Sequence, residues 1–151
     1  IFPIEFKCSV GKNGLTKIKR EGDMKTPKGI FSIGDLYYRR DRNFKIETKL
    51  KTVPILQNMG WCDDANSIKY NKLIKVNNKI KHERLYLKNN KYDLLIPIHY
   101  NMKPVIKNKG SAIFIHLTKN FKSTAGCIAI SKKDFLILLK IITPKTKIKI
   151  D

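Results

Sequence analysis

The sequence predicts a mainly β domain of the α+β class, with at least one helix packed on the strands. Most apolar residues fall in short runs that are rich in β-branched and aromatic side chains and are bounded by glycine, proline or asparagine, as strands are. One segment near the C-terminus has the start and stop signals of a helix. The 151 residues contain no internal repeat and no linker, so we expect one domain over 1–151.

The expected strands are spread along the whole chain. They are 4–11, 30–40, 92–101, 111–117, 126–130 and the final stretch, 147–151. Pro97 lies inside the third of them, which predicts a strand at a sheet edge or one broken by a bulge. The segments 19–29 and 57–72 are expected to be loops, the first polar and the second ordered.

One helix is expected directly after Ser131. Ser131 and Asp134 approximate a capping box, in which the serine hydroxyl accepts a backbone N–H. The apolar residues that follow continue to Thr143, and Pro144 ends the helix.

The formal net charge of +20 raises the question of a nucleic-acid partner. Lysine far outnumbers arginine, the lysines are spread along the whole chain, and no nucleic-acid-binding motif is present. We therefore expect a basic solvated surface and no nucleic-acid partner. The alternative is attraction to an anionic polymer, either of the cell wall or nucleic acid.

The apolar runs are too short to predict a membrane span. The longest nearly uncharged stretch, 135–144, is interrupted by Lys140, whereas a transmembrane helix needs about 20 apolar residues. No signal peptide is visible, because Glu5 and Lys7 stand close to the start of the chain.

The three cysteines, Cys8, Cys62 and Cys127, cannot all pair with one another. None lies in a C-x-x-C pattern, so we predict no metal site. A free cysteine near a histidine instead suggests a nucleophile.

His116 ends one expected strand and Cys127 begins the next. If these strands are antiparallel neighbours about 4.8 Å apart, the two side chains meet, and the imidazole can take the thiol proton. The backbone N–H groups around Gly126 would then face a developing oxyanion. The competing interpretation is a buried structural cysteine beside a histidine that bonds a backbone carbonyl.

The letters around these two residues favour the catalytic interpretation. GSAIFIH (110–116) followed by STAGCIAIS (123–131) resembles the catalytic signature of the L,D-transpeptidases of the YkuD-like family. KREGDMKTPKGIF (19–31) and GWCDDANSIKYNKLI (60–74) follow the order expected for a divergent bacterial branch of that family. The resemblance extends from about residue 8 to residue 150 and implies the YkuD-like fold, with a sandwich-like or barrel-like sheet.

The resemblance also implies an activity. Such enzymes act on the stem peptides of bacterial peptidoglycan, where Cys127 would attack the carbonyl of an L-centred diamino acid and expel the terminal D-alanine. An amine of a second stem would then resolve the thioester into a 3→3 cross-link, as cell wall biogenesis and cell shape require. His116 would be the base and then the acid, Gly126 would help form the oxyanion hole, and Ser111 and Thr124 would lie near the site.

The acceptor stays open at this stage. Water would make the enzyme an L,D-carboxypeptidase, and a lipoprotein lysine would make it an anchoring enzyme. No cofactor is needed, we expect a monomer, and the substrate implies the periplasm or cell envelope. Ala125 stands where many family members have a histidine, so any role of that histidine must be absent or supplied by another group.

Further candidates for the substrate pocket come from the surrounding segments. Asp63 and Asp64 beside Trp61 suit the ammonium of a diamino acid, or else cap backbone N–H groups. The other candidates are His99 and Tyr70 as pocket residues, and Arg42 as the partner of an acidic loop or of a substrate carboxylate.

Overall fold

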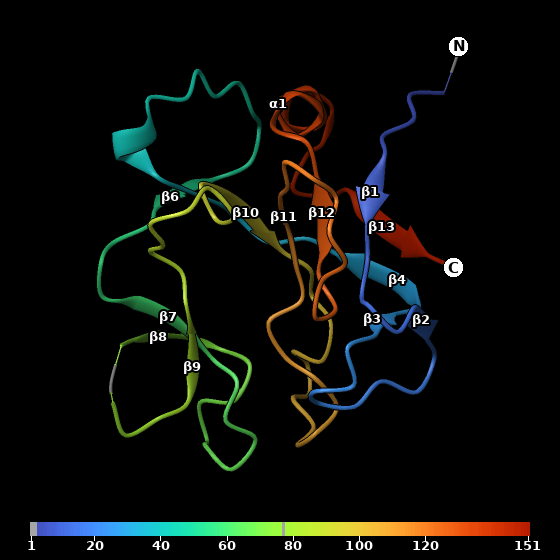
Figure 1. Cartoon of the computed structure of the whole chain (residues 1–151), viewed down its shortest axis with the longest axis vertical. Helices are drawn as coiled ribbons and strands as arrows, with labels where there is room; N and C mark the ends of the chain where they lie inside the picture. The colour runs from blue at the N-terminus through green and yellow to red at the C-terminus, as the bar shows by residue number, and fades with distance from the viewer. Residues whose placement is uncertain (1–2, 77) are drawn as a thin grey trace.

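The computed structural model describes residues 3–76 and 78–151, and its fold is mainly β with one α-helix (Figure 1). The main sheet has the strand order β1-β12-β11-β10-β5-β6. Its strands are β1 (Cys8–Ser9), β12 (Ile128–Ile130), β11 (Phe114–Leu117), β10 (Leu94–Pro97), β5 (Leu36–Tyr38) and β6 (Thr52–Pro54). The predicted α+β class is confirmed.

Three smaller sheets complete the fold. They are β13 (Lys147–Ile150) with β4 (Gly29–Ser32), β2 (Leu15–Thr16) with β3 (Thr26–Pro27), and β7 (Met59–Cys62) between β8 (Leu73–Lys75) and β9 (His82–Arg84). The β7–β9 sheet lies at the lower left of Figure 1, at the opposite end of the view from the helix α1.

The helix α1 (Lys132–Ile141) begins where its capping signal predicts. Ser131 accepts a hydrogen bond from the backbone N–H of Asp134 at 3.1 Å, which satisfies a donor that the first helical turn leaves free. The helix ends at Ile141, two residues before the predicted end, and Ile142 is its C-cap.

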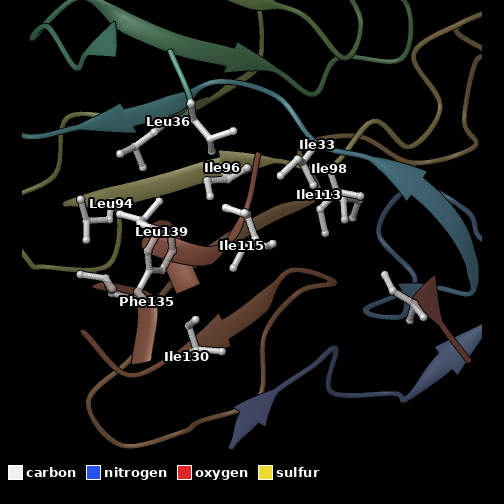
Figure 2. Close-up of a cluster of buried hydrophobic side chains, with 14 residues drawn as sticks. Ile33, Leu36, Leu94, Ile96, Ile98, Ile113, Ile115, Ile130, Phe135 and Leu139 are labelled. Carbon is white, nitrogen blue, oxygen red and sulfur yellow. The ribbon is translucent and has the colours of Figure 1, made fainter. Parts of the chain in front are cut away.

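Alternation along β11 gives the main sheet two different faces. Ile115 and Leu117 belong to a core that also contains Phe135 and Leu139 of α1, as Figure 2 shows for several of its members. Phe114 packs instead with the residues of a second core, in which Trp61, Leu85, Tyr92, Leu95 and Cys127 are buried. The cysteine of interest therefore lies on the face of the sheet away from the helix.

All six expected strands are shorter in the structure, and two of them differ most. Of 4–11, only Cys8–Ser9 pairs in the sheet. The segment 30–40 is divided into β4 and β5, and Arg40–Arg42 forms a short 3₁₀ helix. The segment 57–72, expected to be a loop, contains the strand β7. Its residues 59–61 pair with β8 on one side, and its residues 60–62 pair with β9 on the other.

The edge alternative predicted at Pro97 is wrong. The bulge alternative fits, because the register on the β5 side changes by one residue between the Leu95–Tyr37 pair and the isolated Ile98–Ile33 bridge. β10 pairs with β11 on one side and with β5 on the other. Ile98 donates its N–H toward β11, to Ile113, so the nitrogen of Pro97 faces the other neighbour. The ladder with β5 has already ended at Leu95, and the missing N–H therefore breaks no bond.

Candidate active site

Cys127 and His116 are brought to one face of the sheet by a parallel pairing. β11 and β12 run parallel, with His116 opposite Ala129. Cys127 precedes Ala129 by two residues, so its side chain shares the face of Ala129 and of His116. The expected antiparallel arrangement is wrong, because the loop between the two strands carries the chain back to the start of the ladder before β12 begins.

The sulfur of Cys127 is buried against the backbone of the segment that leads into β11. The N–H of Phe114 donates to Sγ at 3.3 Å, and the thiol donates to the carbonyl of Ala112 at 3.2 Å. Burial raises the pKa of the Cys127 thiol to about 11, although the Phe114 N–H opposes this shift. The resting group is therefore a neutral thiol.

His116 is held as a neutral base. Its Nδ1–H donates to the carbonyl of Leu117 at 2.9 Å, which leaves the lone pair of the neutral imidazole on Nε2. Nε2 is buried and has no hydrogen-bond partner among the residues that the structure describes. Burial lowers the pKa of His116 to about 4. The imidazole is therefore unprotonated at neutral pH and takes up a proton only during the reaction.

Tyr92 fixes the plane of the imidazole from the side. Its ring meets that of His116 edge to face, with the centroids 5.4 Å apart. The Tyr92 hydroxyl donates to Oε1 of Glu83 at 2.9 Å, and Lys91 Nζ lies 3.7 Å from the same carboxylate oxygen.

His116 and Cys127 line a common cavity of about 130 Å³. Among the predicted site residues, Asp63, Ser111, Thr124 and Ala125 line it as well. Ala125, Thr124 and His116 also border a larger hollow of about 560 Å³. Its remaining lining includes the cationic side chains of Lys91, Lys119 and Lys122 and no carboxylate.

The turn before Cys127 is closed by Thr124. The Thr124 hydroxyl accepts from the N–H of Gly126 at 3.1 Å and donates to the carbonyl of Cys127 at 2.6 Å. Gly126 has a φ of +142°, and a Cβ there would lie 2.9 Å from the carbonyl oxygen of Lys25. In this conformation the Gly126 N–H donates to the Thr124 hydroxyl. That hydrogen bond must break before the Gly126 N–H can donate to an oxyanion.

Ser111 and Tyr70 meet at one carboxylate. The hydroxyl of Ser111 donates to Oε2 of Glu21 at 2.8 Å, and the hydroxyl of Tyr70 donates to the same oxygen. Tyr70 itself is buried behind the cavity, where burial raises the pKa of its phenol, and it accepts the N–H of Gly110 at 3.0 Å.

Asp63 differs from its neighbours in the GWCDD stretch. Its Oδ1 is buried with no hydrogen-bond partner, and burial raises the pKa of the carboxyl group. Asp64 lies outside the residues that line either cavity and accepts the N–H of Asn66 at 3.0 Å. Trp61 is buried in the second core and donates Nε1–H to Asn71 at 2.9 Å.

His99 and Arg42 are not among the residues that line either cavity. His99 is exposed, and its Nδ1 lies 2.8 Å from the hydroxyl of Ser32. Arg42 donates to the carbonyl of Lys88 at 2.9 Å and lies 3.8 Å from the carboxylate of Asp93.

Comparison with known proteins gives one match. Residues 3–150 match the YkuD family, described as the L,D-transpeptidase catalytic domain. The chain belongs to the YkuD family. The search of curated proteins found no match, and neither did the search of solved structures. The resemblance noted in the sequence is confirmed, and with it the YkuD-like α+β fold.

Membership of the YkuD family supports L,D-transpeptidase-type activity in general and a substrate in cell-wall peptidoglycan, which lies outside the cytoplasm. Over residues 3–76 and 78–151, no helix is long and apolar enough to span a bilayer. In the same part of the chain, no cluster of three or more histidine, cysteine or acidic residues could hold a metal ion.

The sequence analysis did not name four residues that line the cavity of Cys127: Lys19, Glu83, Lys91 and Tyr92. Glu83 lies in the HERLY stretch and Tyr92 in KYDLLI, both of which resemble segments of the family. Neither segment carries a local pattern that points to chemistry, because the residues reach the cavity from separate strands and loops.

Proposed function

We propose that this protein is a peptidoglycan L,D-transpeptidase in which Cys127 is the nucleophile and His116 is the general base. The observation that carries the proposal is that the residues bearing a buried thiol and an unpartnered imidazole nitrogen line one cavity. A histidine in a purely structural role would use both ring nitrogens or expose one of them to water.

The acylation half of the reaction uses these two groups alone. Cys127 Sγ attacks the carbonyl carbon of the L-centred diamino acid in a tetrapeptide stem, and the thiol proton passes to Nε2 of His116. The C–N bond to the terminal D-alanine then breaks, and the imidazolium returns the proton to the departing amine. A thioester on Cys127 and free D-alanine result.

The second half regenerates the thiol. An amine of a second stem attacks the thioester and transfers a proton to His116, and the sulfur leaves and takes that proton back. The product is a 3→3 cross-link. The hollow of about 560 Å³ bordering His116 supports a peptide acceptor, since a single water needs only about 30 Å³.

The resting pKa values suit this order of events. A neutral imidazole, with its pKa near 4, is free to accept the thiol proton at neutral pH, and a neutral thiol, with its pKa near 11, resists oxidation. The negative charge therefore forms on sulfur only as the proton leaves.

Binding of the diamino acid is assigned to Asp63. Asp63 lines the cavity that holds Cys127, and its Oδ1 has no hydrogen-bond partner within the described residues, so the carboxylate suits an ammonium group. Ser111, Thr124 and Ala125 would shape the same pocket. We place Trp61 and Tyr70 behind the pocket, as support, and give no substrate contact to Asp64, His99 or Arg42.

The test is incubation with a disaccharide-tetrapeptide followed by mass spectrometry. The wild-type protein is expected to release D-alanine and form a dimer of stems, and a thioester adduct should map to the peptide that contains Cys127. Cys127→Ala should give neither product. Tripeptide without dimer would assign L,D-carboxypeptidase activity instead, and turnover by Cys127→Ala would refute the nucleophile.

A binding protein for an anionic polymer is the rival from another class. It predicts no turnover of the stem peptide and an affinity that falls steeply as the salt concentration rises. The same incubation is repeated at two salt concentrations with a wall polymer present, and both turnover and polymer binding are measured. Turnover favours the transpeptidase, whereas salt-sensitive binding without turnover favours the binding protein.

A further inference from the structure

Lys19 differs from every other lysine in the chain. Its side chain is buried, with 4% exposed, whereas the other lysines are exposed or half-buried. A buried ammonium group destabilises a fold unless its protons are bonded. Lys19 also lines the cavity that holds the Cys127 sulfur.

Gly110 makes room for the Lys19 side chain, and the Lys19 ammonium lies close to Gly126. A Cβ on Gly110 would lie 2.8 Å from Cε of Lys19, and a Cβ on Gly126 would lie 3.5 Å from its Nζ. The ammonium group thus reaches the backbone residue directly before the nucleophile. No side chain larger than hydrogen at 110 would leave the lysine in place.

Asp23 binds the Lys19 ammonium group. Its Oδ1 accepts from Lys19 Nζ at 2.7 Å, and its two oxygens also accept the N–H groups of Arg20 and Lys25. Within residues 3–76 and 78–151, the one other acceptor of Nζ is the carbonyl of Arg20, at 3.4 Å. An ammonium has three protons, so one remains for a ligand.

The side-chain hydroxyls around the sulfur have acceptors already. The Ser111 hydroxyl donates to Glu21, that of Thr124 to the Cys127 carbonyl, and that of Tyr92 to Glu83. The cavity therefore contains a fixed cation next to Gly126, while these neutral donors are engaged within the protein. A group of that kind recognises an anionic oxygen.

We propose that the Lys19 ammonium, positioned by Asp23, binds an anionic oxygen of the donor peptide at the reacting end. This inference rests on the proposed function and adds a substrate-binding residue to it. Two oxygens of the donor have this chemistry: the terminal carboxylate of the leaving residue, and the oxyanion that forms when Cys127 attacks.

The test measures the rate at which Cys127 is acylated, by intact-protein mass, with tetrapeptide donors that end in a free carboxylate or in an amide. Lys19→Met combined with Asp23→Asn removes both charges at nearly constant volume, which avoids leaving an unpaired buried charge. Lys17→Met, at an exposed lysine outside the cavity, removes the same charge from the chain and serves as the control.

The double variant is expected to acylate at least 10-fold more slowly than wild type with the free acid, while Lys17→Met stays within twofold. If the loss disappears with the amide donor, Lys19 binds the terminal carboxylate; if it persists, Lys19 binds the oxyanion. Equal rates for a folded double variant and wild type, on both donors, would overturn the proposal.

A second readout does not depend on turnover. N-acetyl-D-alanine is titrated into the ¹⁵N-labelled protein while the amide signals of Gly126 and Cys127 are followed. Saturable shifts support the Lys19 site if the affinity derived from them falls at least 10-fold in the double variant. They do so even if the wild-type protein forms no adduct, a result that would refute the proposed function alone. Without an adduct, absent or unchanged shifts overturn the Lys19 site as well.

Discussion

His116 and Cys127 project from the same face of two parallel strands into one cavity, with the register that sets Ala129 opposite His116. The imidazole, with its pKa lowered to about 4, and the buried thiol, with its pKa raised to about 11, are therefore both neutral at rest. This relationship leads to five measurable outcomes.

His116→Ala should abolish acylation and leave the fold intact. Nε2 is the proposed acceptor of the thiol proton, and removing a general base costs roughly 10²–10⁴-fold in rate. The measurement is the rate of adduct formation by mass, with circular dichroism as the folding check. Acylation at the wild-type rate would mean that another group is the base.

The rate of acylation, kcat/KM, should be nearly independent of pH over a broad range. His116 is unprotonated above its pKa of about 4, and Cys127 remains a thiol below its pKa of about 11. The rate should fall below about pH 4, where the imidazole becomes protonated and cannot act as a base. An acid limb near pH 6 to 7 would contradict a neutral resting pair.

The stability of the fold should decrease as the pH falls from about 6.5 to about 4. The pKa of His116 is depressed in the folded state, to about 4 from the ordinary 6.5, so the unfolded chain binds the proton first. At ~1.4 kcal/mol per pKa unit the contribution is about 3 kcal/mol. Urea unfolding of wild type and His116→Leu at pH 7 and pH 4 measures it.

In that comparison, His116→Leu should lose less stability between the two pH values than wild type loses. Other groups titrate in both proteins, so the difference between the two losses isolates the imidazole. Equal losses would place His116 in contact with solvent.

Thr124→Val should slow acylation about 10-fold, and Thr124→Ser should stay within twofold of wild type. The hydroxyl joins the Gly126 N–H to the Cys127 carbonyl and so sets the turn that carries the nucleophile. Removing it leaves two buried backbone groups unpaired, at a cost of roughly 1–3 kcal/mol. Thermal unfolding and the acylation rate, measured together, check both effects.

Gly126→Ala should destabilise the fold by roughly 3 kcal/mol and block acylation. The residue has a φ of +142°, and its Cβ would meet the carbonyl of Lys25 at 2.9 Å. Gly14→Ala is the matched control, because Gly14 has a φ of +84° and nothing lies within 4 Å of its Cβ. That control should lose only about 1 kcal/mol and keep its activity.

The local patterns of the sequence predicted the elements that depend on short-range physics. The helix after Ser131 forms because its cap and its apolar stripe are encoded within a few residues. β11, β12 and β13 lie within their predicted segments for the same reason. β7 was missed because its residues become a strand only through pairing with β8 and β9.

By itself, the sequence determined the class of the fold, the family and the two residues on which the proposed chemistry depends, since these are written in local apolar patterns and in a specific motif. The direction in which β11 and β12 pair was decided by the tertiary structure, as was the central position of β10. Tertiary contacts also bring Lys19, Glu83 and Tyr92 to the sulfur of Cys127. These features depend on residues far apart in the chain, and no local propensity encodes which distant segments become neighbours.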